Sequence, residues 1–343
     1  MPHTHSRNWF AILAGALVLQ ILLAVVLGFW AQRQSAAAPQ SPLVGADAKA
    51  IDRLVVDGPA GGDDNANQVK AATQKIELVR KDARWILPGS FDAPADDSKV
   101  RTLFEKLAQD RRGSPVGSTK ESQRRFRVAD DIYERHLVAQ GGGKTLAEVW
   151  LGTATAFRKT AVRAAPDADV YAVDLASWDM PTTPNDWLDT GLIKIDPGTL
   201  SKIDIADTHG SVGLEHESGD KPGWKASQKF QGHDLNAAHA QALVDLIGRM
   251  RVDAVLGTKL EPSWSQERPD LRLVFTDAKG EPVTWTVSKS KSDVGYVLKS
   301  SDKPWYFELK DYSAKPLLEA ADPQRLFGKD VVPAPALPKP AKH

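Results

Sequence analysis

The sequence predicts an α+β fold, in which an N-terminal transmembrane helix is followed by two duplicated units. Each unit is expected to be an antiparallel β-meander with one packed helix and a second meander. Three observations predict this arrangement: an uncharged apolar run from Phe10 to Trp30, a Trp placed six residues before a Phe at two places, and alternating runs around both places. A chain of 343 residues has room for two units of ordinary domain size.

The apolar run is the predicted membrane span. From Phe10 to Trp30 it carries no charge, and Gln20 is its one strongly polar side chain. As a helix it would span about 30 Å, the thickness of a bilayer core, with Trp9 and Trp30 at the interfaces. The alternative is a cleavable signal peptide, because small residues follow Ser35. The apolar region of such signals is usually only about 7 to 15 residues long, which favours an uncleaved anchor.

The flanks of the span and the composition of the chain predict its organisation. A short N-terminus that carries Arg7 stays most easily in the cytoplasm, and the long C-terminal part is then exported. We therefore expect a single-pass protein of the bacterial inner membrane with a periplasmic body. The predicted segments are a cytoplasmic N-terminus (1–9), the span (10–30), a linker (31–49), a first unit (50–190), a second unit (191–328) and a disordered Pro-rich tail (329–343).

The repeat begins at the paired aromatic residues. A shift of 139 positions places Trp85 on Trp224 and Phe91 on Phe230. Each Phe precedes a segment with helical spacing of its apolar residues, and both segments end in arginines. The expected N-caps of these two helices are Asp96 or Asp97 in the first unit and Asp234 or Asn236 in the second.

Alternating runs predict the strands on both sides of each helix. Paired strands are expected ahead of each Trp, beginning near Ile51 and Lys75 in the first unit and near Leu200 and Ser211 in the second. Behind each helix, a shift of 135 aligns two glycine-containing hairpins and places Trp150 on Trp285. Coincidence among common patterns is the alternative, but the shared order of Trp, Phe, helix and hairpin favours duplication.

Composition excludes several classes of function. Lys plus Arg equals Asp plus Glu at 44 each, so no net charge draws the chain to nucleic acid. The absence of cysteine excludes disulfides, thiolate catalysis and Cys-ligated metals. His233 and His239 lie six residues apart and so lack the i, i+4 spacing of a helical zinc motif, and a metal site of His209, His216 and His233, the alternative, would have to be assembled by folding. We expect no catalytic residue, no cofactor and no metal, and therefore no enzyme.

The candidate contact residues are aromatic or basic. Of the ten tryptophans, Trp187 and Trp264 are not placed regularly, and exposed aromatic rings can stack on sugars or anchor a partner. The sequence "QRRFR" adds a short basic cluster of Arg124, Arg125 and Arg127. A solvated helix explains this cluster most simply, and the alternative is a contact with an acidic partner or with lipid head groups.

Several motifs resemble those of the bacterial family called domain of unknown function 4340 (DUF4340). They are the segment "WILPGSFDAPADDSKVRTLFEKL", the "WLG" hairpin and the junction "PNDWLDTGLIKIDPGTL". The resemblance implies a periplasm-facing auxiliary protein associated with the permease and ATPase subunits of an ABC-type, gliding-motility-like transport system. It implies no substrate, and the basic segment between Ser118 and Leu137 departs from the shorter segment expected in the family.

The sequence thus leads to a non-enzymatic, membrane-anchored envelope protein that acts as a scaffold in an ABC-type transport assembly. Two alternatives stay open. One is a glycan-binding module of the cell envelope that uses exposed aromatic residues. The other is a hydrolase whose catalytic residues are scattered along the sequence.

Overall fold

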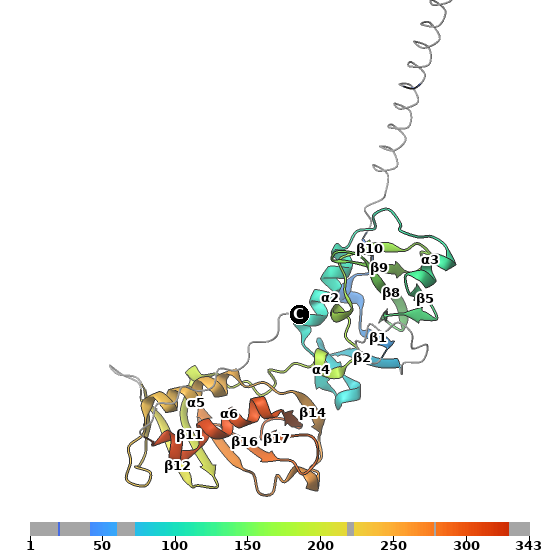
Figure 1. Ribbon diagram of the computed structural model, residues 1–343. Helices are drawn as coiled ribbons and strands as arrows, with labels where there is room; N and C mark the ends of the chain where they lie inside the picture. Colours follow the sequence, from blue (N-terminus) through green and yellow to red (C-terminus); the bar gives the residue numbers. More distant parts are fainter. Residues whose placement is uncertain (1–19, 21–41, 60–72, 218–222, 278, 329–343) are drawn as a thin grey trace, which may run out of the picture. The chain divides into compact units, whose positions relative to one another are not determined.

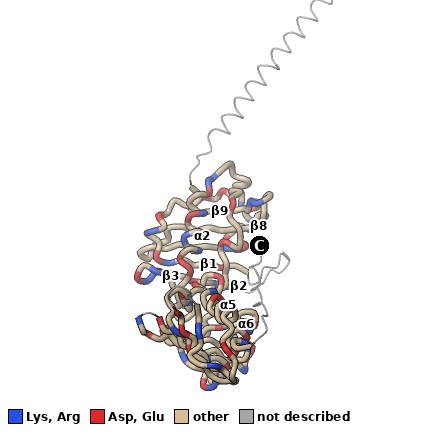
Figure 2. Tube along the Cα trace, turned by 90° about the vertical axis from the view of Figure 1, so that its left-hand side faces the viewer, with Lys and Arg blue, Asp and Glu red and all other residues tan. Residues whose placement is uncertain are grey.

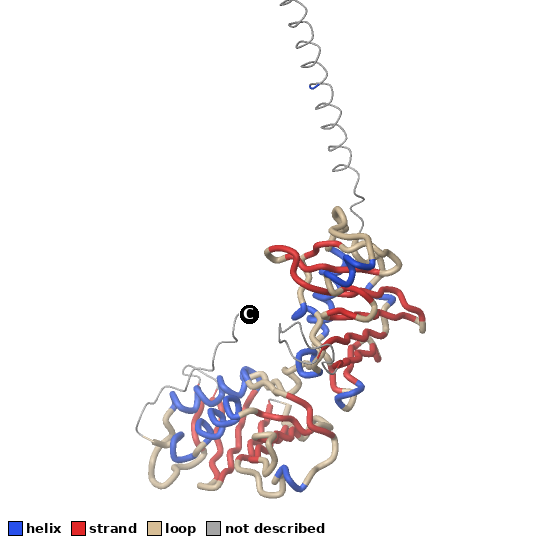
Figure 3. The backbone as a smooth tube through the Cα atoms, turned by 45° about the vertical axis from the view of Figure 1, so that its right-hand side comes forward, coloured by secondary structure: helices blue, strands red, loops and turns tan. Residues whose placement is uncertain are grey.

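The computed structural model describes residue 20 and residues 42–59, 73–217, 223–277 and 279–328. The predicted span, apart from residue 20, and the predicted Pro-rich tail lie outside these residues. Within the described part of the chain, no helix is long and apolar enough to cross a membrane. Strands hold more of the described residues than helices do (Figure 3). The predicted α+β class is therefore confirmed.

The chain divides into two compact units. Unit 1 takes its described residues from Met1–Ile51, Val56–Gln74 and Arg101–Pro181, and unit 2 takes its own from Asp52–Val55, Lys75–Val100 and Thr182–His343. Residues 42–49, which we expected in the linker, belong to the folded body: Leu43 is buried and a short 3-10 helix, η1, covers Ala48–Ala50.

The first sheet has eight strands in the order β10-β9-β8-β7-β1-β2-β3-β4. Its strands are β1 (Arg53–Pro59), β2 (Thr73–Lys81), β3 (Arg84–Leu87), β4 (Ala93–Pro94), β7 (Arg135–Gly141), β8 (Lys144–Ala156), β9 (Lys159–Ala164) and β10 (Tyr171–Val173). The predicted glycine turn joins β7 to β8, with positive φ values of 57° and 76° at Gly142 and Gly143 that glycine adopts without strain.

Helix α2 (Asp97–Gln109) covers one face of this sheet in unit 1. The Asp96 carboxylate accepts hydrogen bonds from the backbone N–H groups of Ser98 and Lys99, as predicted for the N-cap. Phe104 and Leu107 of the helix line an apolar cavity of about 260 Å³ together with Ala139 and Ala147 of the sheet. The helix therefore lies over the face that carries Ala139 and Ala147.

The second sheet also has eight strands, in the order β13-β12-β11-β15-β16-β17-β18-β14. Its strands are β11 (Leu200–Asp207), β12 (Ser211–Glu217), β13 (Gly223–Ala226), β14 (Ala254–Gly257), β15 (Leu271–Asp277), β16 (Pro282–Lys289), β17 (Tyr296–Ser300) and β18 (Tyr306–Leu309).

Two helices lie over one face of the second sheet, α5 (Ala237–Arg249) and α6 (Asp311–Ala321) (Figure 1). Asn236 caps α5 by accepting from the N–H groups of Ala238 and His239, which confirms one of the two predicted caps. Helix α6 was not expected, because Pro316 in its interior obscures the helical pattern of Ala314, Leu317 and Ala321. It is followed by α7 (Pro323–Leu326).

Seven strands of each sheet follow one common order, while the eighth differs, with β4 beside β3 and β14 beside β18. In the first sheet, β1, β2 and β3 form a three-strand meander, and β7, β8, β9 and β10 form a four-strand meander. The two meanders meet where β1 lies beside β7. Starting from β13, the second sheet repeats this order with β11 in the place of β1 and with β15 to β18 in the place of β7 to β10.

Strand register corrects one expected match. A shift of 136, and not 135, relates the partners across the hairpins: Leu137, Val149 and Ala164 correspond to Leu273, Trp285 and Ser300. At this shift Val149, and not the expected Trp150, takes the place of Trp285 in the pairing. Because a slip of one residue moves a side chain to the other face of a sheet, Trp150 lies on the face opposite to the one that α2 covers.

The second face of each sheet is partly covered by the segment that leads from the helix to the next meander. In unit 1 this segment contains α3 (Lys120–Arg125) and the two-stranded sheet of β5 (Val128–Ala129) and β6 (Ile132–Tyr133). In unit 2 it contains the 3-10 helix η5 (Pro262–Trp264). The remaining short helices are η2 (Pro88–Ser90), η3 (Ser177–Asp179), α4 (Pro184–Trp187) and η4 (Pro197–Thr199).

Candidate functional site

A column of stacked side chains crosses the second face of the first sheet. The ring of His136 stacks on Trp150 with centroids 5.0 Å apart, and the Tyr133 ring lies 5.4 Å from His136 on the other side. The guanidinium carbon of Arg163 lies 3.6 Å from the centroid of the Trp150 ring. Trp150 thus lies between an imidazole and a guanidinium, in the geometry of a cation–π contact.

His136 contacts a carboxylate through each ring nitrogen. Nδ1 lies 3.2 Å from Asp57 and Nε2 lies 3.0 Å from Glu148, while Tyr133 donates to Asp57 at 2.6 Å. Burial alone would lower the pKa of His136, but the hydrogen bonds and charges of the two carboxylates together raise it. Burial, with the adjacent Asp57, raises the pKa of Tyr133 to about 12.

This arrangement limits the chemistry of His136. With both nitrogens facing carboxylates, the ring is held as an imidazolium and keeps no free nitrogen to act as a base. Asp57 and Glu148 lie at opposite edges of the ring, so they do not converge on one point where an ion could be chelated. The cluster is therefore an internal ion-pair network.

Arg163 fastens the covering segment to the sheet. It is 9% exposed, its Nε donates to the carbonyl of Val128 at 2.8 Å, and it pairs with the carboxylate of Asp130. Val128, Trp150, Ala161 and Val170 form a small core beneath this segment. A buried guanidinium that binds both a carbonyl and a carboxylate holds residues 128–130 in one position.

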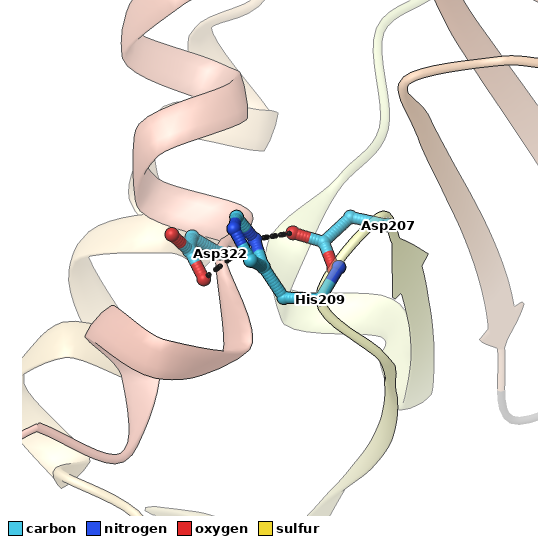
Figure 4. Close-up of side chains that lie close together, drawn as sticks. All are labelled: Asp207, His209 and Asp322. Atoms are coloured by element: carbon cyan, nitrogen blue, oxygen red, sulfur yellow. Dashed lines mark hydrogen bonds and ion pairs between the residues drawn. The ribbon is translucent and has the colours of Figure 1, made fainter.

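A second cluster, Asp207, His209 and Asp322, lies in unit 2 (Figure 4). His209 Nδ1 lies 3.1 Å from an oxygen of Asp207 and 3.5 Å from an oxygen of Asp322, and all three donor atoms lie within 4.8 Å of one another. The hydrogen bond to Asp207, with the charge of Asp322, raises the pKa of His209. Unlike the carboxylates around His136, these two face the same nitrogen.

The converging donors of this cluster are of the type that binds divalent metals, one imidazole nitrogen with two carboxylate oxygens. Both carboxylates also accept hydrogen bonds from backbone N–H groups. Asp207 accepts from the N–H groups of His209 and Gly210, and Asp322 caps α7 through the N–H of Gln324. A protonated His209 satisfies the two carboxylates without a metal, so the cluster joins the β11–β12 turn to the start of α7. His216, which we had considered with His209, lies against Trp224 instead.

The structure places the two predicted aromatic contacts in the interior. Trp187 is 1% exposed and Trp264 is 4% exposed. The Trp264 ring packs against Tyr306 with centroids 5.0 Å apart, and the Trp187 carbonyl accepts from the N–H of Asp96. The expectation that these two rings are exposed is therefore wrong, because each fills a packing position in unit 2.

The predicted basic cluster lies on and after α3, a helix that begins with a capping box between Thr119 and Ser122. Arg124 pairs with Asp131 at 2.6 Å, and Arg127 pairs with Glu134 at 2.6 Å. Arg125 lies over the Phe126 ring, 4.5 Å from its centroid. The contacts of these arginines in the structure are with neighbouring residues of the same segment.

The exposed aromatic side chains are others. Phe157, in the turn between β8 and β9, is 91% exposed, and Trp178, in η3, is 76% exposed. Phe157 was not among the predicted contact residues, although a large ring in the turn of a hairpin, outside the alternation of the strands, is a signal for such a residue. Basic and acidic residues are interspersed along the described chain (Figure 2).

The described part of the chain thus defines an α+β protein with two eight-stranded sheets, and the charged side chains of the His136 and His209 clusters pair with one another inside it. The sequence model of the family described as "Domain of unknown function (DUF4340)" matches residues 85–273, more than half of the chain. The chain belongs to this family. No curated protein and no solved structure matches it.

Proposed function

We propose that this chain is a non-enzymatic, single-pass protein of the bacterial inner membrane whose periplasmic body binds the permease and ATPase subunits of an ABC-type transport assembly. The observation that carries the proposal is the uncharged run from Phe10 to Trp30, which eleven residues separate from Pro42, where the described body begins. The resemblance to the DUF4340 family supplies the expected partners.

The internal ion pairs support a binding role over catalysis. His136, the histidine most enclosed by carboxylates, has no free nitrogen, and Arg163 is occupied by Val128 and Asp130. Removing either side chain would leave charges of the fold without their partners. The order that seven strands of each sheet share supports the further proposal that the body arose by duplication of one sheet-and-helix unit.

Co-purification tests the proposed function. The full chain, extracted from its native membrane in a mild detergent and crosslinked, should bring down a multi-span permease and an ATPase. A chain that is recovered from membranes but is crosslinked to no transport subunit would count against the scaffold role.

The glycan-binding alternative is favoured by one observation, the 76% exposure of Trp178. Envelope glycans that stack on this indole would shift the tryptophan fluorescence of the full chain, and a Trp178→Ala variant would lose the shift. A panel of glycans that produces no shift would remove this alternative.

A further inference from the structure

The chain enters the folded body at one end of unit 1. The N–H of Leu43 donates to the carbonyl of Asp110 at 2.7 Å, and Arg112 donates to the carbonyl of Leu43 at 3.1 Å. Leu43 is 1% exposed, so this attachment is part of the core. Asp110 directly follows α2, and the entering chain is therefore fixed at the C-terminal end of that helix.

The two most exposed aromatic side chains lie on elements tied to this same end. Thr160, near the start of β9, pairs with Val173 at the end of β10, so the β8–β9 turn that carries Phe157 lies beside the residues that follow β10. One of these residues, Asp174, donates its N–H to the Asp110 carboxylate at 3.3 Å. Asp179 of η3, next to Trp178, pairs with Lys106 in the last turn of α2 at 2.6 Å.

The side chains at this end have the chemistry of a membrane interface. Phe157 and Trp178 are 91% and 76% exposed, more than any other large hydrophobic residue in the described part of the chain. The next two residues after Phe157 are Arg158 and Lys159, and both are exposed. Aromatic rings partition into the interfacial region of a bilayer, and nearby cations attract anionic head groups.

The length of residues 31–41 limits how far the attachment point at Leu43 can lie from the membrane. Residues 31–41 separate the predicted span from Pro42. They reach at most about 40 Å when fully extended, and about 20 Å as a flexible coil. The attachment point at Leu43 therefore lies within about 40 Å of the bilayer if residues 10–30 span it.

We propose that Phe157, Arg158, Lys159 and Trp178 form a membrane-contact surface that docks unit 1 onto the bilayer that holds the chain. This inference rests on the anchoring in the proposed function and adds to it a fixed orientation of unit 1 at the membrane. Its occupant is the lipid surface, with the rings in the interfacial layer and the two cations at anionic head groups.

The absence of cysteine from the chain allows a direct test. Single cysteines replace Phe157, Trp178 and, as a control within unit 1, Lys144, which is exposed and lies at the opposite end of β8 from Phe157. Each full-length variant is labelled with an environment-sensitive fluorophore and placed in nanodiscs of phosphatidylcholine and phosphatidylglycerol, with or without lipids that carry a quencher. We expect the quencher to reduce emission at least twofold at 157 and 178, and to leave emission at 144 unchanged.

The head-group part of the inference has its own variant, Arg158→Ser with Lys159→Ser. It should reduce quenching at 157 in discs with phosphatidylglycerol and leave it unchanged in discs of phosphatidylcholine alone. If the chain elutes with the discs but 157 and 178 behave like 144, the contact surface is refuted while the anchor stands. If the chain does not elute with the discs, the anchor and the contact surface both fail. A response of Trp178 to glycans without quenching by lipid would assign the surface to a glycan instead.

Discussion

At the scale of single residues, the His136 cluster concentrates charge that only the folded chain brings together. Asp57, His136 and Glu148 come from β1, β7 and β8, and the side chain of His136 is 17% exposed. In this setting His136 contacts both carboxylates, and Asp57 also accepts from Tyr133. Removing one member of such a network leaves the other charges partly buried without a counter-charge.

We therefore expect the His136→Ala substitution to lower the free energy of unfolding by about 2 kcal/mol. Urea titration of the full-length protein in detergent, followed by tryptophan fluorescence, measures this change. The matched control is His233→Ala, at an exposed histidine, which should change the value by less than about 0.5 kcal/mol. Equal effects of the two substitutions would contradict the ion-pair assignment.

The stabilisation from His136 should depend on pH with a definite sign. Because its pKa is raised in the folded state, the folded protein holds the proton more tightly than the unfolded chain, whose histidines titrate near about 6.5. The contribution is fully present below about pH 6.5 and is lost as the pH rises through the folded pKa. The stability difference between the wild type and His136→Ala should therefore shrink as the pH is raised. A difference that grows with pH would refute this.

At the scale of elements, strand register decides which aromatic residues form the core. Trp285 in β16 is fully buried and packs edge-on against Phe275 with centroids 4.8 Å apart. In β8 the position that corresponds to Trp285 is Val149. Trp150 is the next residue, and its ring contacts His136 and Arg163 instead. Similar Trp-containing hairpins therefore place their indoles on opposite faces.

We expect Trp285→Ala to lower the free energy of unfolding by about 3 to 5 kcal/mol, because it opens a cavity in a packed core. Trp178→Ala, at an exposed ring, is the matched control and should have an effect below about 0.5 kcal/mol. Thermal and urea unfolding of both variants measure the difference. A small effect at Trp285 would show that its site can collapse around the lost ring.

At the scale of the whole molecule, the balance of charge governs which partners it attracts. The formal net charge is zero, and both signs are interspersed along the described chain (Figure 2). Affinity for nucleic acid depends on neutralising many phosphates with a basic surface.

We therefore expect the full chain in detergent to leave the mobility of duplex DNA unchanged at physiological salt. A gel-shift titration checks this, with a basic DNA-binding protein as the positive control. Retardation of the duplex that weakens steeply as salt is raised would contradict the expectation.

The sequence by itself determined the α+β class and the glycine turn between β7 and β8, and it narrowed the N-caps of α2 and α5 to two candidates each, of which Asp96 and Asn236 are the caps in the structure. These features depend on residues that are close together in the sequence, so the spacing of apolar residues and the capping residues predict them directly.

Only the tertiary structure decided the rest. The burial of Trp187 and Trp264, the exposure of Phe157 and the meeting of Asp57 with His136 all depend on how distant strands pair and on which face each side chain occupies. A one-residue change of register reverses a face while leaving the local pattern unchanged, so local spacing could not distinguish Trp150 from Trp285.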